Sequence, residues 1–140
     1  MNALIVVADA GHARLFRIRH SWKDLREQEV LIHSASRLRN RELSSDAAGR
    51  ARDPQSTLDP RTSAKQHEEQ SFAKQLGKHL KQCHNASPFD ELILVASPRF
   101  LGMLRAELPA PLDRLESRTI QKDLIHMDID DLAEYIRNYR

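Results

Sequence analysis

Residues 92–98 of the sequence read LILVASP, and this short stretch decides the predicted fold. Residues 92–96 are aliphatic throughout, which is typical of a strand that is covered on both faces of a sheet. Ser97 and Pro98 follow directly, and a serine N-cap with proline at the first helical position starts a helix. The stretch therefore predicts a buried strand that runs straight into a helix, as in α/β proteins.

A second aliphatic run, ALIVVA at residues 3–8, predicts a central strand near the start of the chain. The turn residues at 9–11 and the alternating segment 13–19 then predict a hairpin. After a polar connection at 22–27, the β-branched and aliphatic residues of 29–33 predict a third strand. These three strands form an antiparallel meander in the predicted sheet.

A long helix is predicted to begin at Ser63, because Gln66 stands three residues later, as in a capping box. Its apolar side chains recur at helical spacing, at Phe72, Leu76, Leu80 and Cys83. Gly77 interrupts this helix at a cost of about 1 kcal/mol relative to alanine. A close packing contact at this glycine would explain its presence.

The helix that starts after Ser97 is expected to end before Pro109, residues 115–121 form a weaker predicted strand, and Asp128 caps a last helix. The predicted order is three strands, a long loop, and then helix, strand, helix, strand and helix. The fold class is therefore α/β, with residues 1–140 as one domain. A central mixed sheet, antiparallel at first, is flanked by helices.

The loop at 37–62 has no apolar period of 2 or 3.6 residues and contains Gly49, Pro54 and Pro60 as breakers. Loops of this length are usually functional or disordered. The loop carries six arginines against four carboxylates: Arg37, Arg39, Arg41, Arg50, Arg52 and Arg61. Arginine suits bidentate phosphate contacts, and a flexible arginine-rich segment can become ordered on RNA. A solvated linker of mixed charge is the alternative interpretation.

The composition is that of an ordinary globular chain of 140 residues, with 40% hydrophobic and 30% charged residues. The net charge of +2 is too small to predict polyanion binding by itself. The opening apolar run is far shorter than the roughly 20 residues that span a bilayer, and it lacks the features of a secretory signal. Cys83 is the single cysteine, so no internal disulfide forms. We expect a cytoplasmic protein without membrane insertion.

Four segments of the sequence resemble the bacterial host-attachment family, which is named for a requirement in attachment to host cells. They are residues 6–16 (VVADAGHARLF), 46–50 (DAAGR), 97–105 (SPRFLGMLR) and 122–124 (KDL). The motif positions are Asp9, Asp46, Gly49, Arg50, Pro98, Arg99, Phe100, Leu101, Gly102, Arg105, Lys122 and Asp123. The family name describes a phenotype, and an attachment role would be indirect for a chain without an export signal.

The order of elements also resembles the middle domain of archaeal and eukaryotic class I release factors and of Pelota, an RNase H-like arrangement. In release factors the corresponding loop carries Gly-Gly-Gln. Here Gly49 is followed by Arg50 and the tripeptide is absent. The resemblance therefore implies a module that associates with RNA or the ribosome without hydrolysis and without a cofactor. Gly49 and the loop arginines are its predicted contacts.

Two other classes of function stay open. The protein could be a metal-dependent hydrolase of RNA or a phosphoester, with Asp9, His12 and Asp123 as its catalytic or metal-binding cluster. Strand ends in α/β folds often carry such groups. The spacing of these three residues matches no known ligand pattern, and each aspartate could simply bond a neighbouring backbone. A cytoplasmic protein-binding adaptor with an indirect role in attachment is the third class. The sequence does not give the oligomeric state.

Two local arrangements suggest ligand sites. Ser97 and Arg99 at a helix start could hold an anion, but plain helix capping is the preferred interpretation, because no glycines that would let a phosphate approach the backbone precede Ser97. His79, Cys83 and His84 suggest zinc, but structural zinc sites usually draw four ligands from paired motifs. We therefore predict no metal site, with Cys83 as a small core residue and both histidines at the solvent margin.

We predict that residues 37–62 are poorly ordered in the free protein, because they lack an apolar face that could offset the entropy cost of ordering. Limited trypsin digestion should first cut after Arg41, Arg50 or Arg52. Protection of all three sites would mean that the loop is packed.

Overall fold

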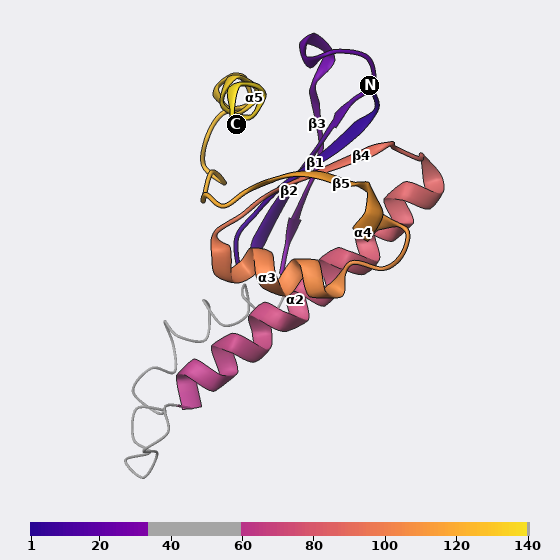
Figure 1. The fold of residues 1–140 in the computed structure, drawn as a ribbon. Coiled ribbons are helices and arrows are strands. Elements are labelled where there is room, and N and C mark those ends of the chain that lie inside the picture. The colour runs from indigo at the N-terminus through magenta and orange to yellow at the C-terminus, as the bar shows by residue number, and fades with distance from the viewer. Residues whose placement is uncertain (34–59, 140) are drawn as a thin grey trace.

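The computed structural model describes residues 1–33 and 60–139, and a mixed five-stranded sheet forms its centre (Figure 1). The strand order is β3-β2-β1-β4-β5. The strands are β1 (Ala3–Ala8), β2 (His12–Ile18), β3 (Arg26–Ile32), β4 (Glu91–Val95) and β5 (Glu116–Ile120). Strands β1, β2 and β3 pair in antiparallel fashion, whereas β1, β4 and β5 are parallel. The predicted α/β class and mixed sheet are confirmed, and the likeness to a release-factor middle domain stays a prediction.

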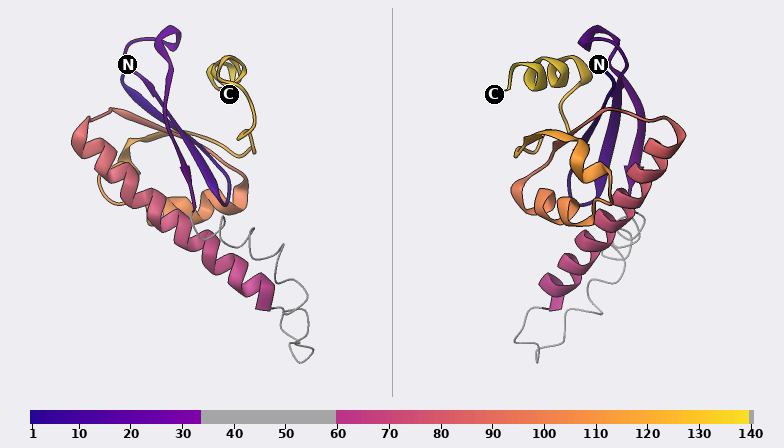
Figure 2. Two further views of the ribbon diagram at one scale, coloured as in Figure 1. Left: turned by 180° about the vertical axis from the view of Figure 1, so that it is seen from behind. Right: turned by 45° about the vertical axis from the view of Figure 1, so that its right-hand side comes forward.

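Helices cover both faces of this sheet. They are the 3-10 helix η1 (Trp22–Asp24), and α2 (Pro60–Ala86), α3 (Pro98–Glu107), α4 (Leu112–Leu115) and α5 (Ile129–Asn138). The long helix α2 and α3 lie on one face and α5 lies on the other (Figures 1 and 2). Among the described helices, none is long and apolar enough to cross a membrane.

Strand β1 is buried at all six positions, as its unbroken aliphatic sequence predicts. Its side chains divide between two cores because successive residues of a strand point to opposite faces. Leu4 and Val6 pack with α2 and α3, whereas Ile5 and Val7 pack with α5. The sheet is therefore an apolar layer between two layers of helix.

The element boundaries differ from prediction in three places. Helix α2 begins at Pro60, three residues before Ser63, because proline is well tolerated in a first helical turn. Residues 60–62 of the predicted loop therefore belong to α2. Strand β3 begins at Arg26, inside the predicted connection at 22–27, since edge pairing with β2 accommodates its polar residues. The single-turn helix α4 is too short to leave a periodic pattern.

Residues 34–59, which include positions 37–59 of the predicted loop, lie outside the described residues. This segment contains the motif positions Asp46, Gly49 and Arg50 and the arginines Arg37, Arg39, Arg41 and Arg52. Arg61 lies within the first turn of α2. The predicted role of these residues in RNA contact stays a prediction.

Gly77 permits the close approach of α2 to the end of α3. A Cβ atom at Gly77 would lie 2.7 Å from the backbone oxygen of Glu107, closer than such atoms pack. The predicted packing reason for this helical glycine is thereby confirmed. Gly102 on α3 is exposed, and a Cβ atom there would have no neighbour within 4 Å.

We predict opposite effects on stability for the same substitution at these two glycines. Gly77→Ala gains about 1 kcal/mol of helix propensity but forces an overpacked contact that typically costs 1–3 kcal/mol. We expect a net loss of about 1 kcal/mol, or roughly 4 °C in Tm. Gly102→Ala should instead raise Tm, since only the propensity gain applies. Thermal melts of both variants test this, and a stabilised Gly77→Ala would contradict the packing argument.

Candidate functional site

The fold brings three segments of the predicted motif to one edge of the sheet. Strands β1, β4 and β5 are parallel, so their carboxyl ends meet at the same edge, which we call the carboxyl edge. Asp9 follows β1, Ser97 follows β4, and Lys122 and Asp123 follow β5. Open α/β sheets bind ligands outside this edge. The carboxyl edge is therefore the first place to look for a site.

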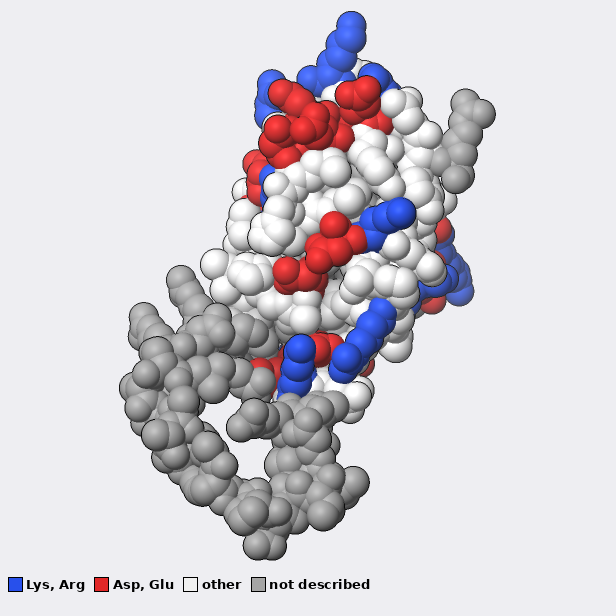
Figure 3. All heavy atoms as spheres, turned by 90° about the vertical axis from the view of Figure 1, so that its left-hand side faces the viewer, with Lys and Arg blue, Asp and Glu red and all other residues white. Residues whose placement is uncertain are grey.

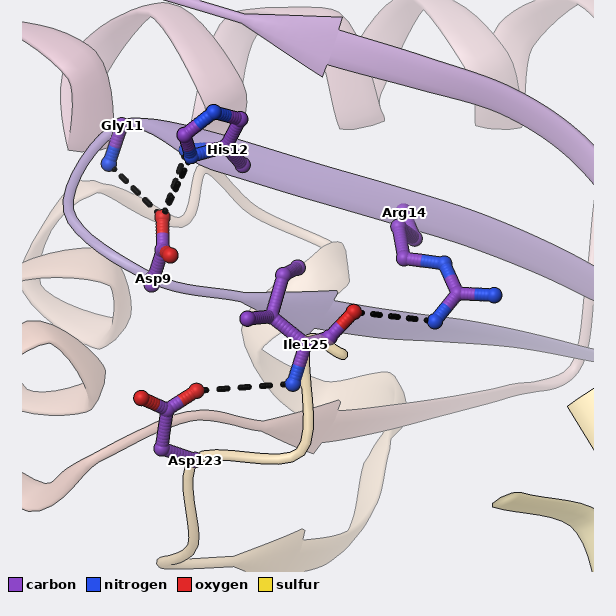
Figure 4. Close-up of polar contacts among 6 residues, drawn as sticks. All are labelled: Asp9, Gly11, His12, Arg14, Asp123 and Ile125. Carbon is purple, nitrogen blue, oxygen red and sulfur yellow. Dashed lines mark hydrogen bonds and ion pairs between the residues drawn. The ribbon is translucent and has the colours of Figure 1, made fainter. Parts of the chain in front are cut away.

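Asp9 bonds the turn between β1 and β2 through one of its carboxylate oxygens. Its Oδ1 atom accepts hydrogen bonds from the backbone nitrogens of Gly11 (2.9 Å) and His12 (2.7 Å) (Figure 4). The same oxygen lies 3.2 Å from Nδ1 of His12, and the Asp9 backbone nitrogen donates to the carbonyl oxygen of His12 at 2.9 Å. These contacts are those of an aspartate that stabilises a turn through its own backbone. The predicted turn contact of Asp9 is thereby confirmed.

Asp123 bonds to its own segment in the same way, and it does not meet Asp9. Its Oδ1 atom accepts a hydrogen bond from the backbone nitrogen of Ile125 at 3.4 Å (Figure 4). Strand β4 lies between β1 and β5, so two strand spacings, roughly 9–10 Å, separate the ends of the two strands that precede these aspartates. The arrangement does not assemble the carboxylate pair that the hydrolase hypothesis requires.

Two surface hollows among the described residues lie away from these aspartates. One lies between α2 and α3, and the other lies along α5. The first is lined by His67, Gln70, Ser71, Lys74, Met103, Ala106 and Glu107, and the second by Met127, Asp131, Glu134, Tyr135, Asn138 and Tyr139. Neither hollow includes Asp9 or Asp123.

Arg99, the predicted anion ligand, is paired with a carboxylate of the protein. Its Nε atom lies 3.3 Å from Oε2 of Glu69, a buried residue of α2. A buried carboxylate needs a partner charge, so Arg99 ties α3 to α2. Ser97 stands at the N-cap of α3 with Pro98 in its first turn, but the Ser97 side chain makes no capping hydrogen bond. An added anion would compete with Glu69 for Arg99, and the anion site stays a prediction.

Three other described motif residues also hold the fold together. Phe100 and Leu101 are buried in the core beneath α3. Nε of Arg105 lies 3.2 Å from Oε2 of Glu116 and so links α3 to β5. Gly102 and Lys122 are exposed.

Arg14 is an important residue that the sequence prediction did not single out. Its Nη1 atom donates to the carbonyl oxygens of Ile125 (3.0 Å) and Met127 (2.6 Å), as Figure 4 shows for the first. Its Nε and Nη2 atoms donate to the carboxylate of Glu27 on β3, at 3.0 and 3.1 Å. One guanidinium thus fixes the segment that carries Asp123 against the sheet. The available signal was that β2 carries two arginines, Arg14 and Arg17, among its apolar residues.

Among the described residues, one group of metal-ligating type does come together. It consists of Glu29, His79 and Cys83 and lies between β3 and α2. Asp9 and Asp123 are not part of it.

The charges are distributed unevenly over the surface. Acidic side chains gather at the end of the molecule that carries α5, whose first turns contain Asp128, Asp130 and Asp131 (Figure 3). The repulsion of the Asp128 carboxylate is the largest effect that raises the pKa of Asp131. Helix α2 is basic, with five lysines and arginines against two glutamates. A polyanion would therefore meet least repulsion at α2.

The sheet and its carboxyl edge define an α/β protein with a mixed five-stranded sheet. Several of its described motif residues join the helices to each other or to that sheet. The family described as "Protein required for attachment to host cells" matches residues 4–136, and the chain belongs to this family. The predicted family resemblance is thereby confirmed.

A curated relative is similar to part of the chain. It is the uncharacterized protein RP470 of Rickettsia prowazekii, which is 35% identical over 79 residues. The match covers 55% of this chain and 53% of the relative, so it spans about half the length of each protein.

We predict that Asp9 contributes to stability through its turn. Asp9→Ala should cost about 1–2 kcal/mol, the range measured for side chains that cap exposed backbone N–H groups, whereas Asp9→Asn keeps an acceptor oxygen and should cost less than half of that. Asp123→Ala serves as the control, because it loses one long hydrogen bond at an exposed position. Urea unfolding of the three variants measures the order of these losses. An alanine variant at position 9 as stable as the wild type would remove the structural role of Asp9.

Proposed function

We propose that this host-attachment family protein is a non-catalytic module that associates with RNA, foremost the RNA of the ribosome, through α2 and the arginine-bearing segment before it. The observation that carries the proposal is a basic helix that extends beyond the sheet and presents unpaired lysines. The aspartates of the carboxyl edge support the non-catalytic part, because their carboxylates are bonded to their own backbone.

Helix α2 is much longer than the sheet that it packs on. Its 27 residues span about 40 Å, whereas the longest strands have seven residues and span about 23 Å. The buried positions of the described part of α2 begin at Glu69 and Phe72, and residues 64–67 are exposed. The amino-terminal part of α2 therefore projects past the sheet (Figure 2). Such an element is suited to contact a partner.

The exposed side of α2 carries three lysines in one stripe. Lys74, Lys78 and Lys81 stand at positions i, i+4 and i+7 and so lie on one helix face. Within the described part of the chain, none of the three has an ion-pair partner. Neutralised phosphates release their bound counterions, which is the main source of affinity in sequence-independent nucleic-acid binding. The lysine stripe therefore suits a phosphate backbone.

The arginines at 37–61 precede and enter α2 in the sequence, so the proposal assigns RNA contact to both groups of cations. In the release-factor middle domain that this element order resembles, the loop before the long helix carries the functional tripeptide. Here Arg50 follows Gly49 and the tripeptide is missing. We therefore expect RNA to contact the segment before α2, as in release factors, but without hydrolysis.

We predict that the loss of cations from this surface weakens ribosome association. Tagged protein should sediment with ribosomes at low salt and dissociate as salt rises. The pair Arg50→Ala and Arg52→Ala, and the pair Lys74→Glu and Lys78→Glu, should each lower binding. Each lost phosphate contact should reduce the slope of log affinity against log salt by about 0.7–0.9.

Lys23→Glu is the matched control, since Lys23 is exposed on η1, away from α2. It should leave the salt slope unchanged, and circular dichroism should show all variants folded. Equal affinity and equal slope for the wild type and both double variants would exclude this surface from the function.

A further inference from the structure

A cluster of three metal-ligating side chains lies on the α2 face of the sheet, outside the carboxyl edge. Glu29 comes from β3, and His79 and Cys83 come from α2. Nε2 of His79 lies 2.6 Å from Oε1 of Glu29, and the thiol of Cys83 donates to the same oxygen at 3.6 Å. The three ligand atoms all lie within 4.8 Å of one another.

A β-bulge in β3 accounts for the direction of Glu29. Residues two apart on a regular strand point to the same face, so Glu27 and Glu29 should lie together. The pairing of β2 with β3 shifts between Leu15 and Phe16, with Leu15 opposite Glu29 and Phe16 opposite Glu27. Glu27 therefore bonds Arg14 on the α5 face, while Glu29 meets His79 on the α2 face. Bulges often re-aim a side chain in this way at functional sites.

His79 and Cys83 meet Glu29 because they are one helical turn apart. Positions i and i+4 lie on the same face of a helix, a spacing that suits two ligands of one ion. His84, next to Cys83 in sequence, turns elsewhere: its Nδ1 accepts from the backbone nitrogen of Phe89, and its ring stacks edge-on against the Phe89 ring. The third ligand thus comes from β3 rather than from the neighbouring histidine.

We propose that Glu29, His79 and Cys83 form a binding site for a divalent transition-metal ion, with zinc as the best match, and among the described residues no fourth ligand joins them. Zinc binds carboxylate oxygen, imidazole nitrogen and thiolate sulfur at about 2.0–2.3 Å in a tetrahedron. The edges of such a tetrahedron are roughly 3.3–3.8 Å long. The separations of 2.6 and 3.6 Å from Glu29 Oε1 lie within about 1 Å of those edges. Side-chain rotation is enough to admit the ion.

The charge of this ligand set matches a divalent ion. A glutamate, a cysteine thiolate and a neutral histidine together carry two negative charges, so the loaded site is neutral, which suits a half-buried position. The side chains of Glu29 and His79 are 38% and 27% exposed, so an ion in solution can reach them. On binding, the Cys83 thiol exchanges its proton for the metal and releases that proton to water.

The same contacts argue against a cysteine nucleophile at this place. Burial, with the nearby Glu29 carboxylate as the next cause, raises the pKa of the Cys83 thiol to about 11. A nucleophilic cysteine needs a lowered pKa and a basic histidine as its partner. Here the thiol donates to a carboxylate instead. Metal ligation is the chemistry that uses all three groups.

Cobalt binding tests the site directly. Full-length protein, freed of metal with a chelator and dialysed, is titrated with Co²⁺. We expect one equivalent to produce the thiolate-to-cobalt charge-transfer absorption and the visible bands of four-coordinate cobalt, and zinc to displace it. Zinc should also raise Tm, since it binds the folded chain. Absence of the charge-transfer absorption would overturn the proposal.

Variants assign the ligands. Cys83→Ser should abolish the charge-transfer absorption, and Glu29→Ala and His79→Ala should each weaken zinc binding by roughly 100-fold or more, beyond the 10–100-fold typical of outer-shell partners. His84→Ala is the matched control and should bind zinc like the wild type. Circular dichroism without metal shows that each variant is folded. Wild-type zinc affinity in both Glu29→Ala and His79→Ala would show that the ion binds elsewhere. These results do not depend on RNA binding.

Discussion

The burial of β1 on both of its faces is the constraint on which the rest of the structure depends. This strand pairs with β2 on one side and β4 on the other, so its backbone bonds are satisfied only inside a sheet. Its aliphatic side chains then need apolar cover above and below, at about 25 cal/mol for each Å² removed from water. Helices α2 and α3 supply one cover and α5 the other. The ion pairs and the metal-ligating cluster described above form between this sheet and its helices or between those helices.

Charged side chains join the helices to the sheet at its margins. The Glu69 carboxylate, buried beneath α2, requires Arg99 of α3, and Arg105 of the same helix reaches Glu116 of β5. Removing Arg99 would leave the buried Glu69 carboxylate without its partner charge, which costs more than the pair itself contributes. Among the described motif positions, Arg99 and Arg105 therefore make structural contacts.

The bulge in β3 gives the two faces of the sheet different chemistry. It sends Glu27 to Arg14, which anchors the segment after β5, and it sends Glu29 to His79 and Cys83 on α2. Helix α2 thus takes part in both proposals, through its lysine stripe on the exposed side and through His79 and Cys83 at the sheet. The two sets of residues are distinct, so RNA association and metal binding can be separated by substitution.

The sequence by itself determined the strands, the order of the elements along the chain and the main helices. A strand buried on two faces leaves an aliphatic run in the sequence, and an amphipathic helix leaves a period of 3.6 residues. It also indicated the turn at Asp9, the cap at Asp128 and the family. The cluster of Glu29, His79 and Cys83 was decided only by the tertiary structure, since 50 residues separate Glu29 from His79 and the bulge leaves no pattern in sequence. The tie between Arg99 and Glu69 was hidden for the same reason. Local patterns report which face of an element is buried, whereas contacts between distant elements depend on how the helices pack on the sheet.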